Sequence, residues 1–136
     1  MKLGLISAIL GDLSFEEMID FLAECGLECV EVACWPKGKA ERRYAGVSHI
    51  DVDTLDDEKC AHILDYCQKK GVEISSLAYY PNTMDPDVEK RTAYIEHLHK
   101  LIDASAKLGV NMITTFIGRD PKKTVSQNLE LVKEIW

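Results

Sequence analysis

Apolar and polar positions along the chain follow two alternating patterns. Short apolar runs with many β-branched residues are typical of strands, and apolar residues three or four apart are typical of helices. The runs predict strands at Leu3–Leu10, Val30–Cys34, Val72–Tyr79 and Val110–Ile117. Helices are predicted from Phe15 to Cys25, from Asp56 or Asp57 to Gly71, from about Val88 to Leu108, and from near Thr124 onward. The first strand is expected to be buried, because both of its faces are apolar.

One phrase, in which a helix end, a glycine and an apolar run follow one another, occurs three times, with its glycines at positions 26, 71 and 109. Glycine suits the end of a helix, where the backbone turns left-handed. Right-handed crossovers between such units place all four strands parallel and adjacent. The sequence therefore predicts a single α/β domain over residues 1–136, with a β/α unit repeated four times.

Two architectures fit this order: an open doubly wound sheet, or half of a (β/α)8 TIM barrel. The glycine fingerprint of a dinucleotide-binding sheet is absent from Ala8–Leu13, and the chain has no phosphate-loop motif. Both architectures bind ligands at the carboxyl ends of their strands. Large side chains stand at or just after these predicted ends, and we expect them to line a substrate pocket: Trp35, Tyr79, Tyr80 and Phe116.

Apolar positions within the helices predict which faces pack on the sheet. Ser14 and Glu17 have the spacing of a capping box, which marks the start of the first helix. The faces expected to be buried are Phe15, Met18, Ile19, Leu22 and Cys25; Ala61, Ile63, Leu64 and Cys67; Val88, Thr92, Ile95, Leu98, Ile102 and Ser105; and Leu129, Val132 and Ile135.

Composition narrows the range of partners. The net charge of −7 argues against a nucleic-acid or anionic-membrane surface. No apolar run approaches the roughly 20 residues that span a bilayer. Five cysteines, an odd number, favour reduced thiols and a cytoplasmic protein over a disulfide framework. Cys25 and Cys29 are spaced like a metal pair, but one ends a helix and the other lies beside a strand, which favours small buried hydrophobic residues over a metal role.

Several polar residues are further candidates. The loop Pro36–Thr54 is long enough to suggest a function. His49 in this loop is a candidate base or substrate ligand, although a structural histidine is the default, and Arg119 is a candidate anion ligand after the fourth strand. The sequence Asp85-Pro86-Asp87 is interpreted as a helix start. The same loop contains four basic residues, which either attract a phosphate or carboxylate or are simply solvated: Lys37, Lys39, Arg42 and Arg43. The other histidines are interpreted as residues on helix surfaces: His62, His97 and His99.

Three segments resemble the start of xylose-isomerase-like TIM barrels: Lys2–Ser7, Ser14–Glu17 and Cys25–Val32. Lys107–Val110 is similar to the entry into the fourth strand of these proteins. The superfamily includes sugar-phosphate isomerases and epimerases and an endonuclease IV branch. The endonuclease branch uses histidines near strands three and four, where this chain has Tyr79–Asn82 and Phe116–Arg119. The resemblance therefore favours the sugar branch.

The resemblance implies that this chain is the N-terminal half of a sugar or sugar-phosphate isomerase or epimerase, ending within its fourth helix and inactive alone. Family members bind a divalent metal (Mn, Mg, Co or Zn) near the ends of strands five to eight. Two glutamates from strands five and eight move the proton next to a carbonyl. Those strands are not expected in this chain, so no catalytic or metal residue is assigned.

An isolated half barrel leaves an apolar sheet face and two strand edges without partners. At about 25 cal/mol per Å², several hundred exposed apolar Å² cost many kcal/mol against a net stability of roughly 5–15 kcal/mol. We therefore expect the missing C-terminal half or a second copy to cover this face, or the chain to rearrange into a flatter sandwich. The alternative function is a short, non-catalytic α/β binding or assembly module.

Overall fold

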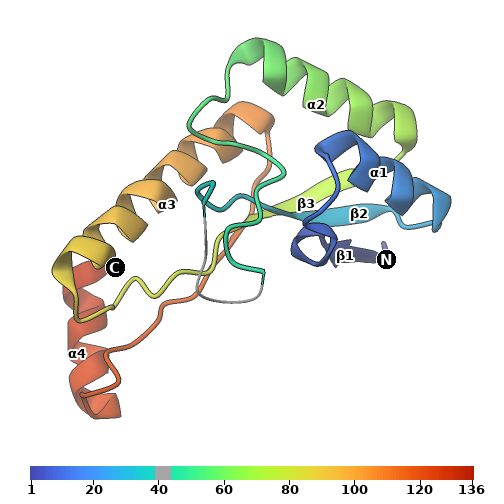
Figure 1. Ribbon diagram of the computed structural model, residues 1–136. Helices are drawn as coiled ribbons and strands as arrows, with labels where there is room; N and C mark the ends of the chain where they lie inside the picture. The colour runs from blue at the N-terminus through green and yellow to red at the C-terminus, as the bar shows by residue number, and fades with distance from the viewer. Residues whose placement is uncertain (39–43) are drawn as a thin grey trace.

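The computed structural model describes residues 1–38 and 44–136, in which four parallel strands form one sheet with the order β1-β2-β3-β4 (Figure 1). The strands are β1 (Gly4–Ile6), β2 (Cys29–Ala33), β3 (Glu73–Ala78) and β4 (Ile113–Thr114). The helices are α1 (Phe15–Glu24), α2 (Asp57–Lys70), α3 (Val88–Leu108) and α4 (Val125–Ile135), and a 3-10 helix, η1 (Ser7–Leu10), follows β1. The element order and the parallel pairing confirm four consecutive β/α units.

The first strand is shorter than predicted. β1 ends at Ile6, and the chain then turns into η1. At this point the backbone N–H of Ala33 donates to the Ser7 hydroxyl at 2.8 Å, in place of a further hydrogen bond between the two strands. Leu5 and Ile6 are only half-buried, so the expectation of a buried strand was wrong. β4 is also short, because it pairs with β3 only at Leu77 and Ala78.

The core lies between the sheet and the helices α1, α2 and α3, which lie on the same side of it (Figure 1). Its centre is formed by fully buried side chains of α1, β2, β3 and α3: Met18, Ile19, Leu22, Val30, Val32, Leu77 and Leu101. The capping box at Ser14 is present, and Gly71 and Gly109 end α2 and α3 in the left-handed conformation, at φ values of 70° and 66°. These helix boundaries confirm the predicted ones to within a residue.

The predicted buried faces of three helices need correction. On α3, Val88 and Ile102 are 59% and 49% exposed, and the face that packs on the sheet carries His97, Leu101 and Ala104 instead. The buried stripe was misplaced because it includes a histidine, which the apolar spacing excluded. On α2, Ala61 and Leu64 are exposed beside the buried Cys60, Ile63 and Cys67; on α4, Leu129 is exposed and no described residue is buried.

None of the described helices combines the length and the apolar character needed to cross a membrane.

Candidate functional site

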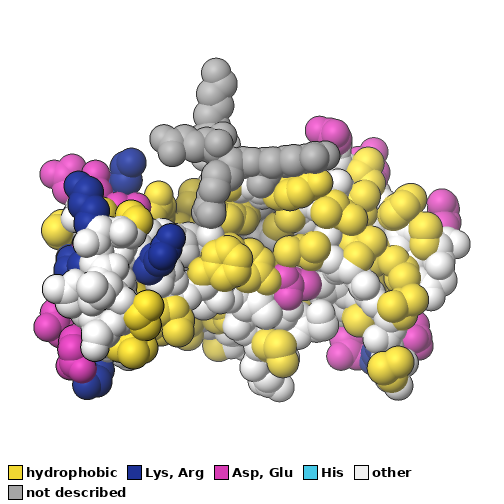
Figure 2. All heavy atoms as spheres, turned by 90° about the horizontal axis from the view of Figure 1, so that it is seen from below, with side chains coloured by type: hydrophobic (Ala, Val, Ile, Leu, Met, Phe, Trp, Pro, Cys, Tyr) yellow, Lys and Arg dark blue, Asp and Glu magenta, His cyan; other side chains and the backbone are white. Residues whose placement is uncertain are grey.

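Side chains of β2 and β3 point alternately to the two faces of the sheet. Val30, Val32 and Leu77 belong to the core under the helices. The opposite side, here called the inner face, carries Glu31, Ser76, Tyr80, Thr114 and Phe116. Figure 2 views the molecule from below the sheet of Figure 1 and shows hydrophobic side chains gathered around an acidic group. The inner face therefore combines apolar surface with a few polar groups, as ligand sites do.

A bulge in β3 sets the register of this face. Val30 lies opposite Ile74, but Glu31 lies opposite Ser76, so that Ser75 is an extra residue in β3. The Ser75 hydroxyl donates to the carbonyl oxygen of Val30 at 3.0 Å. A bulge of this kind re-aims the side chains that follow it. Here it places Ser76 directly beside Glu31 and returns Leu77 to the core.

Glu31 is the centre of the polar network. Its Oε2 accepts a hydrogen bond from the Ser76 hydroxyl at 3.1 Å, and its Oε1 accepts one from the phenol of Tyr80. Ser76 is buried, whereas Glu31 and Tyr80 are half-buried. The network thus fixes a carboxylate on the inner face with one hydroxyl donor on each oxygen.

The Tyr80 ring extends back along the sheet from the carboxyl end of β3. Burial raises the pKa of the Tyr80 phenol, the hydrogen bond to Glu31 raises it further, and a contact with the Thr114 hydroxyl opposes these effects. The phenol therefore stays protonated at neutral pH and remains a donor to Glu31. Phe116 packs on Tyr80 with ring centroids 4.7 Å apart and is itself 54% exposed. The two aromatic rings form an apolar border beside the carboxylate.

Trp35 and Tyr79 lie together on the other side of the sheet, against the core under the helices. Their rings meet edge to face at 4.9 Å, and Tyr79 packs in the same way on His97 at 4.6 Å. Tyr79 is fully buried among the core residues, and burial raises the pKa of its phenol. His97 is also buried, and its Nε2 donates to the Cys34 carbonyl at 2.8 Å. The interpretation of His97 as a surface residue was therefore wrong. The four aromatic candidates thus form two separate pairs, with only Tyr80 and Phe116 on the inner face.

His49 connects the β2–α2 loop to the end of β1. Its Nδ1 lies 3.0 Å from the Ser7 hydroxyl and its Nε2 lies 3.3 Å from the Leu10 carbonyl. These partners suit a neutral ring that donates from Nε2 and accepts at Nδ1. Burial lowers the pKa of His49, against a smaller opposing effect of the Leu10 carbonyl. Because the neutral ring bridges the buried Ser7 hydroxyl and the backbone of the half-buried Leu10, its evident role is to hold the loop.

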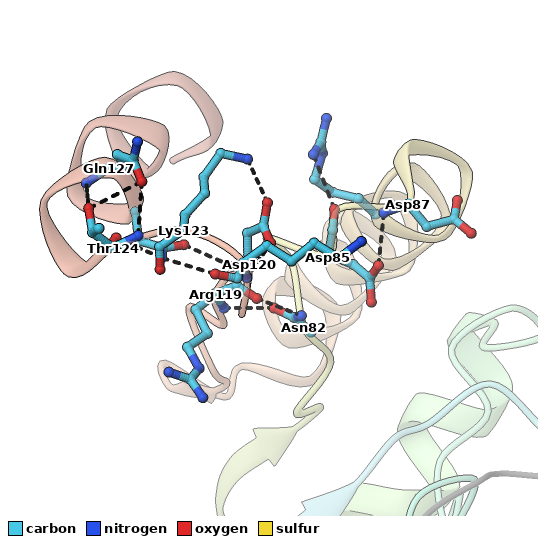
Figure 3. A network of polar contacts seen from close by, with 11 residues as sticks. Asn82, Asp85, Asp87, Arg119, Asp120, Lys123, Thr124 and Gln127 are labelled. Carbon is cyan, nitrogen blue, oxygen red and sulfur yellow. Dashed lines mark hydrogen bonds and ion pairs between the residues drawn. The ribbon is translucent and has the colours of Figure 1, made fainter.

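Arg119 lies in the β4–α4 loop, at the carboxyl end of β4. The Asn82 side chain accepts from the Arg119 backbone N–H at 2.8 Å and donates to its carbonyl at 2.9 Å. Gly118, at φ 81°, allows this close approach, because a Cβ there would lie 2.0 Å from Oδ1 of Asn82. Figure 3 shows the Arg119 guanidinium directed away from the surrounding network, which is centred on the buried Asp120 and includes its ion pair with Lys123. Arg119 is thus held by its backbone and presents its charge to solvent.

The remaining candidates are dispersed. Lys37 pairs with Asp51 at 3.2 Å, whereas Lys39, Arg42 and Arg43 lie outside the described residues. His62 and His99 are exposed on their helices as predicted, and His62 bonds to Glu16. Asp87 caps α3, which confirms its interpretation as a helix start. All five cysteines are free, but Cys25 is exposed and Cys29 is half-buried, so the expectation that both are buried, with Cys25 on the packed face of α1, was wrong.

Within residues 1–38 and 44–136, no three His, Cys, Asp or Glu side chains come together as a metal site. The metal that the resemblance implies therefore does not fit the described part of this chain. A cleft of about 590 Å³ lies at the opposite, amino-terminal ends of β3 and β4, between Val72, Ile74, Gly109 and Met112. Enzymes of (β/α)8 type do not place their chemistry at that end.

Sequence reasoning missed Glu31 and Ser76. Glu31 alternates with buried valines in β2, and a lone acid in such a strand is a usable signal of a polar inner face. The double serine of β3 marks the bulge, but only the pairing register shows which serine meets Glu31.

Comparisons with known proteins agree with the fold. Residues 19–136 match the family model described as a xylose isomerase-like TIM barrel. No curated protein matches the chain.

Solved structures resemble the chain at low identity. The probable 3-DHS dehydratase AsbF of Bacillus anthracis is 18% identical, with a TM-score of 0.69 over 98% of this chain and 45% of its own. D-psicose 3-epimerase, solved in the presence of D-fructose, is 18% identical, with a TM-score of 0.64 over 98% of this chain and 45% of its own. The D-psicose 3-epimerase of Clostridium cellulolyticum H10, solved with D-tagatose, is 17% identical, with a TM-score of 0.62 over 99% of this chain and 48% of its own. The chain thus spans less than half the length of these structures, and its four units correspond to half of a barrel.

Proposed function

The chain belongs to the xylose isomerase-like TIM barrel family, and on this premise we propose that it forms half of a sugar or sugar-phosphate isomerase or epimerase. The observation that carries the proposal is the inner face, where Glu31, Ser76 and Tyr80 form a polar network bordered by Phe116. Tyr80 and Phe116 follow the carboxyl ends of β3 and β4, where barrels of this type bind their substrates. Sugars combine hydroxyl groups with apolar C–H faces, so a carboxylate beside two aromatic rings suits them.

The similar structures add a substrate class to this proposal, because two of them are epimerases solved with the ketoses D-fructose and D-tagatose. The reaction would be proton transfer at a carbon next to a carbonyl, which needs a base and stabilisation of the enediolate oxygen. A divalent metal would supply that stabilisation. In this proposal its ligands and the base belong to the other half of the barrel, because the described residues offer no metal site. The half described here orients the sugar and excludes water.

Arg119 is the proposed contact for a phosphate on the sugar, since it lies in the loop that follows β4 and its guanidinium points away from the surrounding polar network (Figure 3). The free cysteines fit the proposed cytoplasmic location.

Deuterium exchange tests the proposed reaction most directly. The product of the complete reading frame is incubated in D2O with D-fructose, D-tagatose and their phosphate esters, with and without Mn²⁺. We expect exchange of one carbon-bound hydrogen next to the carbonyl, detected by NMR, together with formation of an isomer or epimer. Absence of both exchange and a new sugar across the whole panel would rule out the proposed chemistry.

A non-catalytic assembly module remains the second candidate. It is favoured by apolar side chains left exposed just before and after β4, at an edge of the sheet: Met112, Phe116 and Ile117. Large exposed apolar surfaces mark interfaces. In the enzyme proposal a further four-unit half or a second copy covers them. Sedimentation of this chain that gives a monomer at all concentrations would argue against self-association.

A further inference from the structure

The carboxylate of Glu31 has acceptor capacity that residues 1–38 and 44–136 do not use. Each carboxylate oxygen has two lone-pair directions, and each receives one hydroxyl donor, from Tyr80 or from Ser76. The ion pairs of the described residues involve other carboxylates, and none reaches Glu31. As far as the described residues are concerned, the remaining lone pairs of Glu31 are available to a ligand that brings hydrogen-bond donors.

The two hydroxyl neighbours act as positioning groups. Tyr80 and Ser76 each have a single proton, and each proton is directed at Glu31. Because burial raises the pKa of Tyr80, its phenol keeps this proton at neutral pH. The network consequently presents acceptors toward the ligand, and a phosphate or carboxylate placed here would meet a like charge.

The local backbone supports a role beyond simple packing. The bulge at Ser75 interrupts the β3 ladder at the position that aligns Ser76 with Glu31. If the strand paired without a bulge, Ser75 would stand opposite Glu31, and Leu77 and Tyr79 would change faces. Ala33 and Ala78, the next pair on the same face of the sheet, are small and buried, and Tyr80 reaches past this level to Glu31. The carboxylate is thus held by two strands and one ring at a defined depth on the inner face.

We infer that Glu31 is the specificity-determining residue of the inner face and that it accepts a hydrogen bond from one hydroxyl group of a bound polyhydroxylated sugar. This inference rests on the proposed function for the location of the ligand, but it requires no catalysis. Tyr80 and Phe116 border the same position and cover an apolar face of the sugar. The site therefore selects sugars by the presence and configuration of the hydroxyl that reaches Glu31.

Binding measurements with deoxy sugars test this inference. The product of the complete reading frame is titrated calorimetrically with D-fructose and with its 3-deoxy, 4-deoxy and 6-deoxy analogues. A hydrogen bond to a charged acceptor, left unmade in a closed site, corresponds to about a 10- to 100-fold loss of affinity. We expect one analogue to bind the wild-type protein that much more weakly than D-fructose does.

Two variants link this loss to Glu31. In Glu31→Gln we expect D-fructose to bind about as weakly as the critical analogue binds the wild type, and the two sugars to bind equally well. Glu28→Gln removes the same charge from an exposed position three residues earlier and is expected to leave the discrimination unchanged. The deoxy series on the wild-type protein still tests the inference if Glu31→Gln fails to fold.

The outcomes separate this inference from the proposed function. Discrimination that persists in Glu31→Gln, equal binding of all analogues by the wild type, or no sugar binding at all would overturn the role of Glu31, and the D2O exchange experiment would still decide the chemistry. Glu31-dependent discrimination without hydrogen exchange would support the inference and overturn the proposed catalysis.

Discussion

Replacement of His97 tests how α3 is attached to the sheet. The imidazole is 5% exposed, donates from Nε2 to the Cys34 carbonyl at 2.8 Å, and packs edge to face on Tyr79. Cys34 directly follows β2, the strand that carries Glu31. His97 thus connects a helix to the carboxyl end of the strand that supports the inner face.

In His97→Ala the Cys34 carbonyl loses this donor, and a cavity opens beside Tyr79. A buried polar group left without its partner costs about 1–3 kcal/mol. Loss of the ring from a packed core adds about 1–2 kcal/mol, a low value for large-to-small replacements because the imidazole is partly polar. We expect a decrease of about 3 kcal/mol in the free energy of unfolding, a substantial part of the roughly 5–15 kcal/mol of a typical domain.

Urea unfolding followed by far-UV circular dichroism measures this change, at two protein concentrations so that self-association is detected. His99→Ala is the matched control, because His99 is exposed on the same helix two residues away; its expected change is within about 0.5 kcal/mol. His97→Gln keeps a donor and is expected to recover part of the loss. Equal effects of the two alanine variants would refute the buried hydrogen bond and the packing described for His97.

Three further predictions concern a loop contact, a titrating histidine and the thiols. Gly118→Ala should lower the free energy of unfolding by about 2–3 kcal/mol, as measured in urea, because the left-handed backbone is strained and the new Cβ displaces Asn82. Stability should fall as the pH falls below about 6.5, because burial lowers the folded-state pKa of His49 and the unfolded chain then binds more protons; His49→Gln should flatten this slope. With a thiol reagent at pH 8, Cys25 should react in the folded protein and Cys34 only after unfolding, because burial raises the pKa of Cys34 to about 12.

Each of these three predictions can be checked against a second site or a contrary outcome in the same chain. Gly38→Ala should change stability little, since a Cβ there meets no atom within 4 Å, and equal losses would contradict the Asn82 contact. A slope that survives His49→Gln would assign it to other groups. Cys67 should resemble Cys34, because burial raises its pKa to about 11. Fast labelling of either in the folded state would contradict their burial.

The sequence was sufficient to predict the four β/α units, since each depends on local signals. Apolar periodicity, the capping box at Ser14 and the glycines after α2 and α3 act within a few residues, and the structure contains each of them. The ends of β1 and β4 were not predictable in the same way. They depend on a contact between Ser7 and Ala33 and on how far β4 pairs with β3, both of which involve residues distant in the sequence.

The candidate site was predicted only in part, because it depends on which side of a strand each side chain occupies. Adjacent residues in a strand point to opposite faces, so Tyr79 and Tyr80 cannot line the same surface. Tyr79 joins Trp35 and His97, whereas Tyr80 joins Glu31 and Phe116. The aromatic side chains are conspicuous in the sequence, but their division between core and inner face follows from the alternation of side chains along each strand.

The same alternation explains why the bulge at Ser75 matters for function. Val72 and Ile74 face the helices before the bulge, and Leu77 and Tyr79 face them after it, so the core is continuous only because Ser75 bulges out of the ladder. The bulge also keeps Ser76 and Tyr80 on the inner face, where both donate to Glu31. A deletion of Ser75 would leave Ile74 opposite Val30 and Ser76 opposite Glu31 in a regular ladder, and only the hydrogen bond from Ser75 to the Val30 carbonyl would be lost. The accommodation of Ser75 in a bulge thus preserves both the packing of the core and the polar contacts of the opposite face.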